Sequence, residues 1–95
     1  MFVVLLRFSD NKARAGTYME DHNAWIERGF KDGIFLMVGS LQPNMGGSVI
    51  AYNTTRAELQ KRLSEDPFVS ERIVSAEILE ITPAKMDERL NFLAG

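Results

Sequence analysis

Four short apolar segments divide the chain, and polar or turn-forming residues separate them. Residues 2–8 and 34–38 are continuous apolar runs without polar alternation, which is typical of strands that are buried on both faces. Residues 48–52 and 72–81 are the other two expected strands. Residues 39–47 contain the Pro, Asn and paired Gly residues of a hairpin connection. The pattern therefore predicts four strands, of which the second and third form a hairpin.

Residues 12–30 have helical rather than strand periodicity. Their apolar side chains recur at spacings of three and four residues, as on one face of a helix. That face consists of Ala15, Tyr18, Met19, His22, Trp25, Ile26 and Gly29. The face should point at the sheet, so His22 is expected in a sheltered position.

A second helix is predicted after the hairpin. Thr55 and Glu58 fit a capping box at its start. Pro67 cannot continue a helix and restricts the residue before it, so this helix should end near Glu65. A last short helix is expected over residues 83–93, because proline suits the first helical position. Its apolar face would consist of Met86, Leu90 and Leu93.

The order of elements is β-α-β-β-α-β plus a C-terminal helix, which predicts a ferredoxin-like α+β sandwich with a four-stranded antiparallel sheet. Residues 1–95 are expected to form a single domain. Two helices cover only one face of such a sheet, so apolar side chains would remain on the other. A homodimer with sheets packed face to face would bury them. One alternate set of the following residues should face the partner: Phe2, Val4, Leu6, Phe35, Met37 and Ile50.

Composition narrows the class of protein. The net charge is −2, and 45% of residues are hydrophobic and 25% charged, as in a soluble globular protein. No basic patch is present, which argues against a nucleic acid partner. The first apolar run is too short for a signal peptide or a membrane span, so a cytoplasmic location is expected. The chain has no cysteine and one histidine, so we expect no metal and no cofactor.

His22 is the first candidate for chemistry. A histidine on the sheet-facing side of a helix is either a core residue with one hydrogen bond or a general acid/base in a pocket. Asp66 before Pro67 and Phe68 is the second candidate. This tripeptide either stops a helix in an Asx-type turn or aims the Asp66 carboxylate inward. A carboxylate that contacts the imidazole would orient the ring and fix its tautomer.

Five further residues are candidates for substrate binding. Ser40 is either an ordinary turn residue or a hydroxyl that binds a substrate oxygen. Arg7 is either a surface charge at a strand end or a counter-ion for an anionic substrate. Tyr18, Trp25 and Phe68 could supply apolar or stacking walls for a ring compound.

Together these residues resemble the YciI-like (YCII-related) family of the dimeric α/β-barrel superfamily. The resemblance covers most of the chain, and its most specific elements are the histidine and the Asp-Pro-Phe tripeptide. It rests on Asp10, His22 with Trp25, Gly33, Gly39-Ser40-Leu41 and Asp66-Pro67-Phe68. The resemblance implies a ferredoxin-like protomer that dimerises through its sheets and an active site that contains His22 and Asp66. Many members carry an arginine shortly before the histidine, whereas Met19-Glu20-Asp21 stand here.

Three hypotheses follow for the function. In the first, His22 is a general base oriented by Asp66, for proton abstraction, elimination or isomerisation on a small cyclic or aromatic compound. One member of the resembled family is a dehydrochlorinase of a chlorinated hydroxyquinol. In the second, the chain is a non-catalytic metabolite-binding or assembly module. In the third, His22 is the axial ligand of a haem, for which bulky neighbours leave little room.

Overall fold

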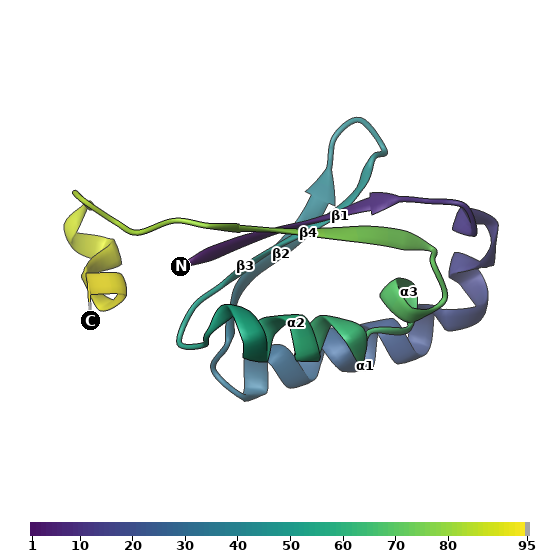
Figure 1. Ribbon diagram of the computed structural model, residues 1–95, viewed down its shortest axis with the longest axis horizontal. Coiled ribbons are helices and arrows are strands. Elements are labelled where there is room, and N and C mark those ends of the chain that lie inside the picture. The colour runs from purple at the N-terminus through teal and green to yellow at the C-terminus, as the bar shows by residue number, and fades with distance from the viewer. Residues whose placement is uncertain (95) are drawn as a thin grey trace.

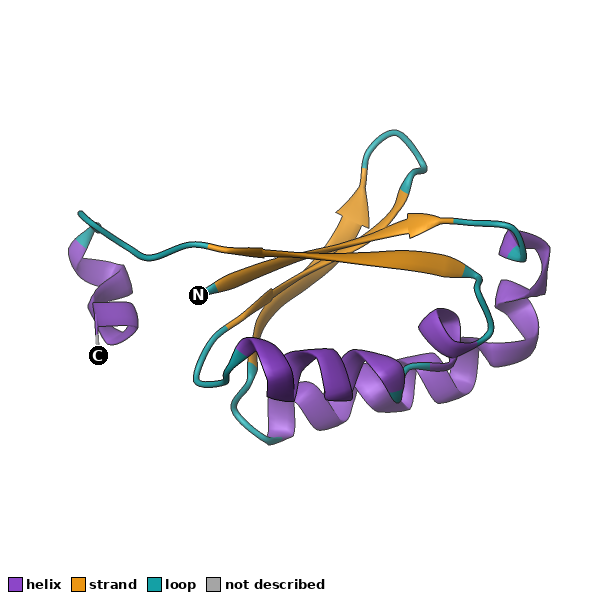
Figure 2. Ribbon diagram, in the orientation of Figure 1, coloured by secondary structure: helices purple, strands orange, loops and turns teal. Residues whose placement is uncertain are grey.

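The computed structural model describes residues 1–94 and contains a four-stranded antiparallel sheet with strand order β2-β3-β1-β4 (Figures 1 and 2). The elements in chain order are β1 (Phe2–Phe8), the 3₁₀ helix η1 (Lys12–Arg14), α1 (Ala15–Lys31), β2 (Phe35–Leu41), β3 (Gly46–Ala51), α2 (Arg56–Ser64), α3 (Pro67–Ser70), β4 (Val74–Glu80) and the 3₁₀ helix η2 (Glu88–Ala94). The predicted ferredoxin-like α+β fold is confirmed.

The first strand is the centre of the sheet. β1 pairs antiparallel with β3 on one side and with β4 on the other, so that Val4 lies opposite both Val49 and Ile78. Phe2, Val4 and Leu6 are buried, and the residues between them are more exposed. Because side chains alternate between the two faces of a strand, these three residues point toward the helices and their neighbours point away.

Helices α1, α2 and α3 all cover the same face of the sheet (Figure 2). Trp25 of α1 and Leu59 and Leu63 of α2 pack between the helices and the sheet, and all three are buried. At Gly29 the first helix lies so close to β2 that an added Cβ would be 2.1 Å from Cδ2 of Phe35. This contact sets the separation between the helix layer and the edge strand.

The opposite face of the sheet is uncovered in the protomer and carries an apolar cluster. We define the open face by Val3, Leu5, Met37, Ile50 and Leu79. The register places Val3 beside both Ile50 and Leu79, and Ile50 beside Met37. Met37 is 56% exposed and Leu79 is 42% exposed.

A register shift in β2 determines which residues reach this open face. Phe35 and Met37 differ by two positions, yet Phe35 is buried in the core and Met37 is exposed, because the pairing with β3 shifts between them. An irregularity of this kind adds a residue to one strand and reverses the alternation beyond it. Simple alternation along the strand would have placed both side chains on the same face of the sheet.

Capping side chains set where helices α2 and α3 begin. The Thr55 side chain accepts a hydrogen bond of 3.2 Å from the Glu58 N–H, so the predicted N-cap of α2 is confirmed. α2 ends at Ser64, within one residue of the predicted end. Asp66 then caps α3, a four-residue helix that the sequence pattern did not predict.

Two predicted boundaries were wrong. Residues 39–41 and 46–47 belong to β2 and β3, not to a long hairpin loop. The connection is instead a tight turn in which the Met45 N–H donates to the Leu41 carbonyl at 2.9 Å. Asn44 and Gly46, with φ angles of 47° and 127°, supply the left-handed backbone that this turn requires.

The predicted C-terminal helix over residues 83–93 forms only in part. The chain leaves β4 without helical structure, and only the 3₁₀ helix η2 follows, beyond the edge of the helical layer (Figure 1). Asp87 explains the late start, because its carboxylate accepts a hydrogen bond of 2.9 Å from the Arg89 N–H. Hydrogen bonds from the Arg89 side chain and backbone hold the pKa of Asp87 below its usual value. Phe92 contacts Tyr52 edge to face at 5.5 Å between ring centroids.

Candidate functional site

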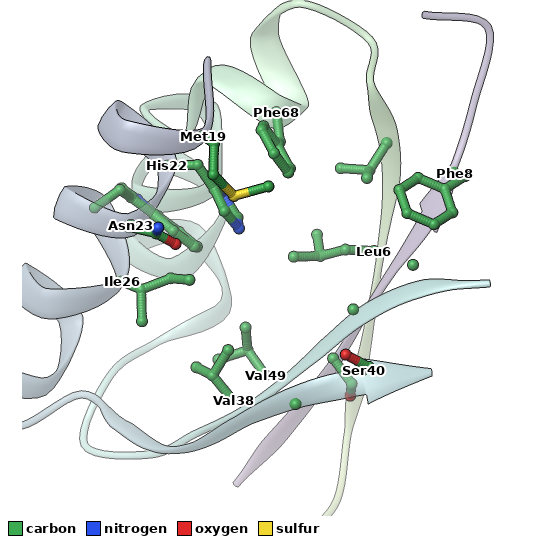
Figure 3. Close-up of a pocket in the computed structure, with 16 residues that line it drawn as sticks. Leu6, Phe8, Met19, His22, Asn23, Ile26, Val38, Ser40, Val49 and Phe68 are labelled. Atoms are coloured by element: carbon green, nitrogen blue, oxygen red, sulfur yellow. The ribbon is translucent and has the colours of Figure 1, made fainter. Parts of the chain in front are cut away.

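A cavity of about 280 Å³ lies between α1, α3 and the sheet (Figure 3). Most of its wall is apolar, and side chains from six elements contribute to it. It is lined by Leu6, Phe8, Met19, His22, Asn23, Trp25, Ile26, Val38, Gly39, Ser40, Gly46, Gly47, Ser48, Val49, Phe68 and Val74. The volume suits a small ring compound and lies just below the range typical of drug-sized ligand sites.

The imidazole of His22 projects from α1 toward this cavity (Figure 3). Its Nδ1 lies 2.8 Å from Oδ1 of Asp66, which is hydrogen-bond distance. The side chain of His22 is 13% exposed and that of Asp66 is fully buried. The structure therefore brings together the two residues that the sequence singled out for acid–base chemistry.

The Asp-Pro-Phe tripeptide explains how Asp66 is held. Pro67 occupies the first turn of α3, and Asp66 before it is extended, with φ −76° and ψ 121°. In this conformation Oδ1 of Asp66 accepts a hydrogen bond of 3.0 Å from the Phe68 N–H. The same oxygen thus caps α3 and contacts the imidazole. Both interpretations of this tripeptide, the turn and the inward carboxylate, describe the same geometry.

The other carboxylate oxygen is unusual. Oδ2 of Asp66 is buried and has no hydrogen-bond partner among residues 1–94. A buried oxygen without a partner is costly in free energy, because its hydration is not replaced. Such groups are few in native structures, and a catalytic role is one explanation for them.

Aromatic rings fix the orientation of His22. Its imidazole stacks on the ring of Phe68 with centroids 3.8 Å apart and planes at 3°. Trp25 lies further along α1, at 6.0 Å and 22°. The Trp25 indole N–H donates to the Arg62 carbonyl at 2.8 Å, which fastens α1 to the end of α2. The imidazole therefore has a defined plane as well as a defined hydrogen bond.

This geometry determines which nitrogen of His22 faces a ligand. With Asp66 ionised, Nδ1–H donates to its carboxylate, so the neutral ring carries its lone pair on Nε2. Within the described part of the chain, no hydrogen bond reaches Nε2. A lone pair at the wall of an apolar cavity can accept a proton from a bound molecule, while the carboxylate stabilises the resulting imidazolium.

The five predicted binding residues differ in their positions. Trp25 and Phe68 line the cavity, and Ser40 lies across it from the helix, on β2 (Figure 3). Tyr18 does not line the cavity, because its hydroxyl bonds to Glu71 at 3.1 Å and accepts from Arg14. Arg7 points to the other face of the sheet and forms an ion pair of 2.7 Å with Glu77. The structure therefore separates Tyr18 and Arg7 from the cavity.

Other lining residues were not recognised as part of a site. Met19 and Ile26 were placed correctly on the sheet-facing side of the first helix, but only as packing residues. Asn23 was not considered at all. It follows His22 directly and lies one helical turn beyond Met19, so it shares the wall that both form. Its spacing of four residues from Met19 was the signal that could have identified it.

The described residues offer neither a metal-binding cluster nor a membrane-spanning helix. Residues 1–94 contain no group of three or more His, Cys, Asp or Glu side chains arranged to hold a metal ion. In the same range, no helix combines the length and apolar character needed to cross a membrane.

The sheet order and the helices on one face define the chain as a ferredoxin-like α+β protein. Among solved structures it is similar to 5-chloro-2-hydroxyhydroquinone dehydrochlorinase (TftG) from Burkholderia phenoliruptrix AC1100 in complex with 2,5-dihydroxybenzoquinone. The TM-score is 0.67, at 14% sequence identity over 88% of this chain and 96% of that chain. At this identity the likeness shows the fold. No family model matches the chain, and no curated protein does so.

Proposed function

We propose that this protein is a small-molecule enzyme in which His22 acts as the general base and Asp66 orients it. The reaction is proton abstraction from a small hydroxylated ring compound, followed by elimination or isomerisation. The observation that carries the proposal is the 2.8 Å contact between Nδ1 of His22 and a fully buried carboxylate, with the imidazole at the wall of the cavity.

The burial of Asp66 supports a role for its charge. A buried carboxylate that contacts an imidazole favours the imidazolium, which is the form that His22 takes after accepting a proton. General base catalysis of this kind contributes about 10²–10⁴-fold to a rate. The stacked rings of His22 and Phe68 support a fixed direction for the transfer, because the imidazole cannot rotate freely.

The structural neighbour supports the reaction class. By its name it removes hydrogen chloride from 5-chloro-2-hydroxyhydroquinone, and it binds 2,5-dihydroxybenzoquinone. For this chain the corresponding reaction carries one hydroxyl proton of the substrate through Nε2 of His22 to the ring carbon that bears chlorine. A second hydroxyl proton then passes to Nε2 while the carbon–chlorine bond breaks with its electron pair on chloride, so the ring becomes a quinone and the net loss is hydrogen chloride. The step needs no oxidant or reductant.

We also propose that the chain is a distant member of the YciI-like family and forms a homodimer through the open face. The family assignment is supported by the convergence of His22, Asp66 and Phe68 at one cavity. The dimer is supported by the exposed apolar side chains of Met37 and Leu79 on an otherwise uncovered sheet. Two such sheets packed face to face would remove these side chains from water.

An activity screen tests the proposed reaction. The purified protein is incubated without oxygen with 5-chloro-2-hydroxyhydroquinone and a panel of small phenols and lactones. Chloride release is measured by ion chromatography, and exchange of substrate protons in deuterated water is measured by NMR. His22→Gln, which retains a polar side chain, should lower kcat at least 100-fold. Glu27→Gln, an exposed change on the same helix outside the cavity, should leave kcat unchanged.

Full activity in the His22→Gln variant would show that another group is the base. If no compound releases chloride or exchanges protons, the proposed enzyme is abandoned. The cavity would then belong to a non-catalytic binding module.

A further inference from the structure

The cavity lacks charged side chains, and this restricts its ligand. None of the residues that line it, within the described range 1–94, is Lys, Arg, Asp or Glu. We infer that the site takes an uncharged hydroxylated ring and rejects the same ring when it carries a carboxylate or phosphate. This inference rests on the proposed site and names the class of its substrate.

Two cations just before α1, Arg14 and Lys12, have other partners. Arg14 bonds to the Tyr18 hydroxyl at 2.9 Å and to Glu71 at 3.3 Å. The Lys12 ammonium lies 4.5 Å from the centroid of the Phe8 ring. Phe8 lines the cavity, but Lys12 does not. Among residues 1–94, no guanidinium or ammonium therefore forms part of the wall that a bound anion would contact.

The buried carboxylate also opposes an anionic ligand. Asp66 is fully buried, and its Oδ2 has no partner in residues 1–94. A ligand that entered with its own negative charge would lose hydration and be repelled by Asp66. A neutral hydroxyl avoids both penalties. It becomes an anion only when its proton reaches Nε2 of His22, and the new oxyanion then lies beside an imidazolium.

The polar groups of the wall suggest how such a ring lies. His22 and Asn23 project from α1, and Ser40 lies across the cavity on β2 (Figure 3). The walls between them are apolar, including Ile26, Val38 and Leu6. A ring with a hydroxyl at one edge and a second oxygen at the opposite edge would meet polar groups at both ends. Hydroquinone has this pattern.

A matched pair of ligands tests the charge preference. Hydroquinone and 2,5-dihydroxybenzoate differ by one carboxylate, and both can be titrated into the intact protein without oxygen. Binding is followed by NMR, from the indole N–H signal of Trp25, the single tryptophan, and the ring signals of His22. Hydroquinone should bind at least tenfold more tightly than the carboxylate, which corresponds to about 1.4 kcal/mol.

A gain-of-function variant makes the test sharper. Met19 lines the cavity and is 43% exposed, so Met19→Arg places a cation at the wall without burying it. This variant should bind 2,5-dihydroxybenzoate at least tenfold more tightly than wild type. Ala24→Arg adds the same charge at an exposed position of α1 outside the cavity and should have no such effect.

Several results would overturn the inference. These are equal or tighter binding of the carboxylate by wild type, an equal gain in the Met19→Arg and Ala24→Arg variants, or no shift of Trp25 and His22 signals with either compound. Binding is measured without turnover, so the two proposals can fail separately. A neutral preference without His22-dependent activity refutes only the proposed function. His22-dependent turnover of carboxylated rings refutes only the neutral preference.

Discussion

Replacing Asp66 by alanine should destabilise the protein, and replacing it by asparagine should not. Alanine removes the acceptor of the Phe68 N–H, and the loss of an N-cap costs about 1 kcal/mol. It also leaves Nδ1 of the nearly buried His22 without a partner, which costs about 1–3 kcal/mol. The free energy of unfolding should therefore fall by about 2–4 kcal/mol. A domain of this size has roughly 5–14 kcal/mol, so the variant should still fold.

Asparagine keeps an oxygen where both hydrogen bonds meet. The Phe68 N–H needs an acceptor, so it should orient the amide with Oδ1 toward itself and His22. The amide nitrogen then takes the place of Oδ2, which has no partner in the described structure. We expect Asp66→Asn to change the free energy of unfolding by less than about 1 kcal/mol. Activity should nevertheless fall about tenfold, because a charged hydrogen bond to the imidazolium is replaced by a neutral one.

Urea unfolding followed by Trp25 fluorescence measures both variants. Trp25 is the single tryptophan and is 1% exposed, so unfolding changes its surroundings completely. All samples should have the same protein concentration, because dimerisation would add to the apparent stability. A loss below about 0.5 kcal/mol in Asp66→Ala would refute the shared hydrogen bonds. Equal losses in both variants would show that the fold needs the charge and not the oxygen.

Three further predictions concern the fold. Light scattering of the wild type should give about twice the chain mass of 10.7 kDa. Leu5→Asp, on the open face, should reduce the measured mass to that of one chain. A folded wild-type monomer would exclude sheet-to-sheet packing. Gly29→Ala should lower the free energy of unfolding by about 1–3 kcal/mol, because its Cβ would overlap the Phe35 ring. Gly16→Ala should raise the free energy of unfolding by about 0.5–1 kcal/mol, because its Cβ would meet no other atom. Equal effects of the two variants in thermal unfolding would contradict the close contact at Gly29. Truncation after Ile81 should expose apolar surface and lower Tm, and an unchanged Tm would show that the C-terminal segment adds nothing to stability.

The sequence predicted the fold well where local rules and burial agree. The bounds of β1 are those expected, and the N-cap at Thr55 and the end of α2 follow from side-chain chemistry. The C-terminal segment was different, because helical spacing of Met86 and Leu90 competed with the cap formed by Asp87. The hydrogen bond of the Asp87 carboxylate sets where the helical segment begins, and the spacing of apolar residues gives no information about that bond.

His22 and Asp66 could be singled out by residue type, but the sequence could not show that they meet. His22 and Asp66 are separated by 44 positions, and only the packing of α3 against α1 brings them into contact. The face to which Arg7 points could not be read from β1, since an apolar run without alternation does not reveal its register. Ser40 was assigned to a loop because Gly39 and the downstream glycines resemble turn chemistry, although the strand continues through it.

The shared oxygen of Asp66 has a consequence for genetic studies of this protein. One oxygen atom caps helix α3 and bonds to the imidazole, so under the proposed function selection for abundance and selection for activity would act on it together. In a mutational survey, most substitutions at position 66 would be depleted under either selection. Asparagine would be tolerated when only abundance is selected and depleted when activity is selected. Substitutions at position 22 that retain packing would be depleted only when growth depends on the reaction. Growth conditions that deplete substitutions at position 22 would therefore be those in which the cell needs the proposed reaction.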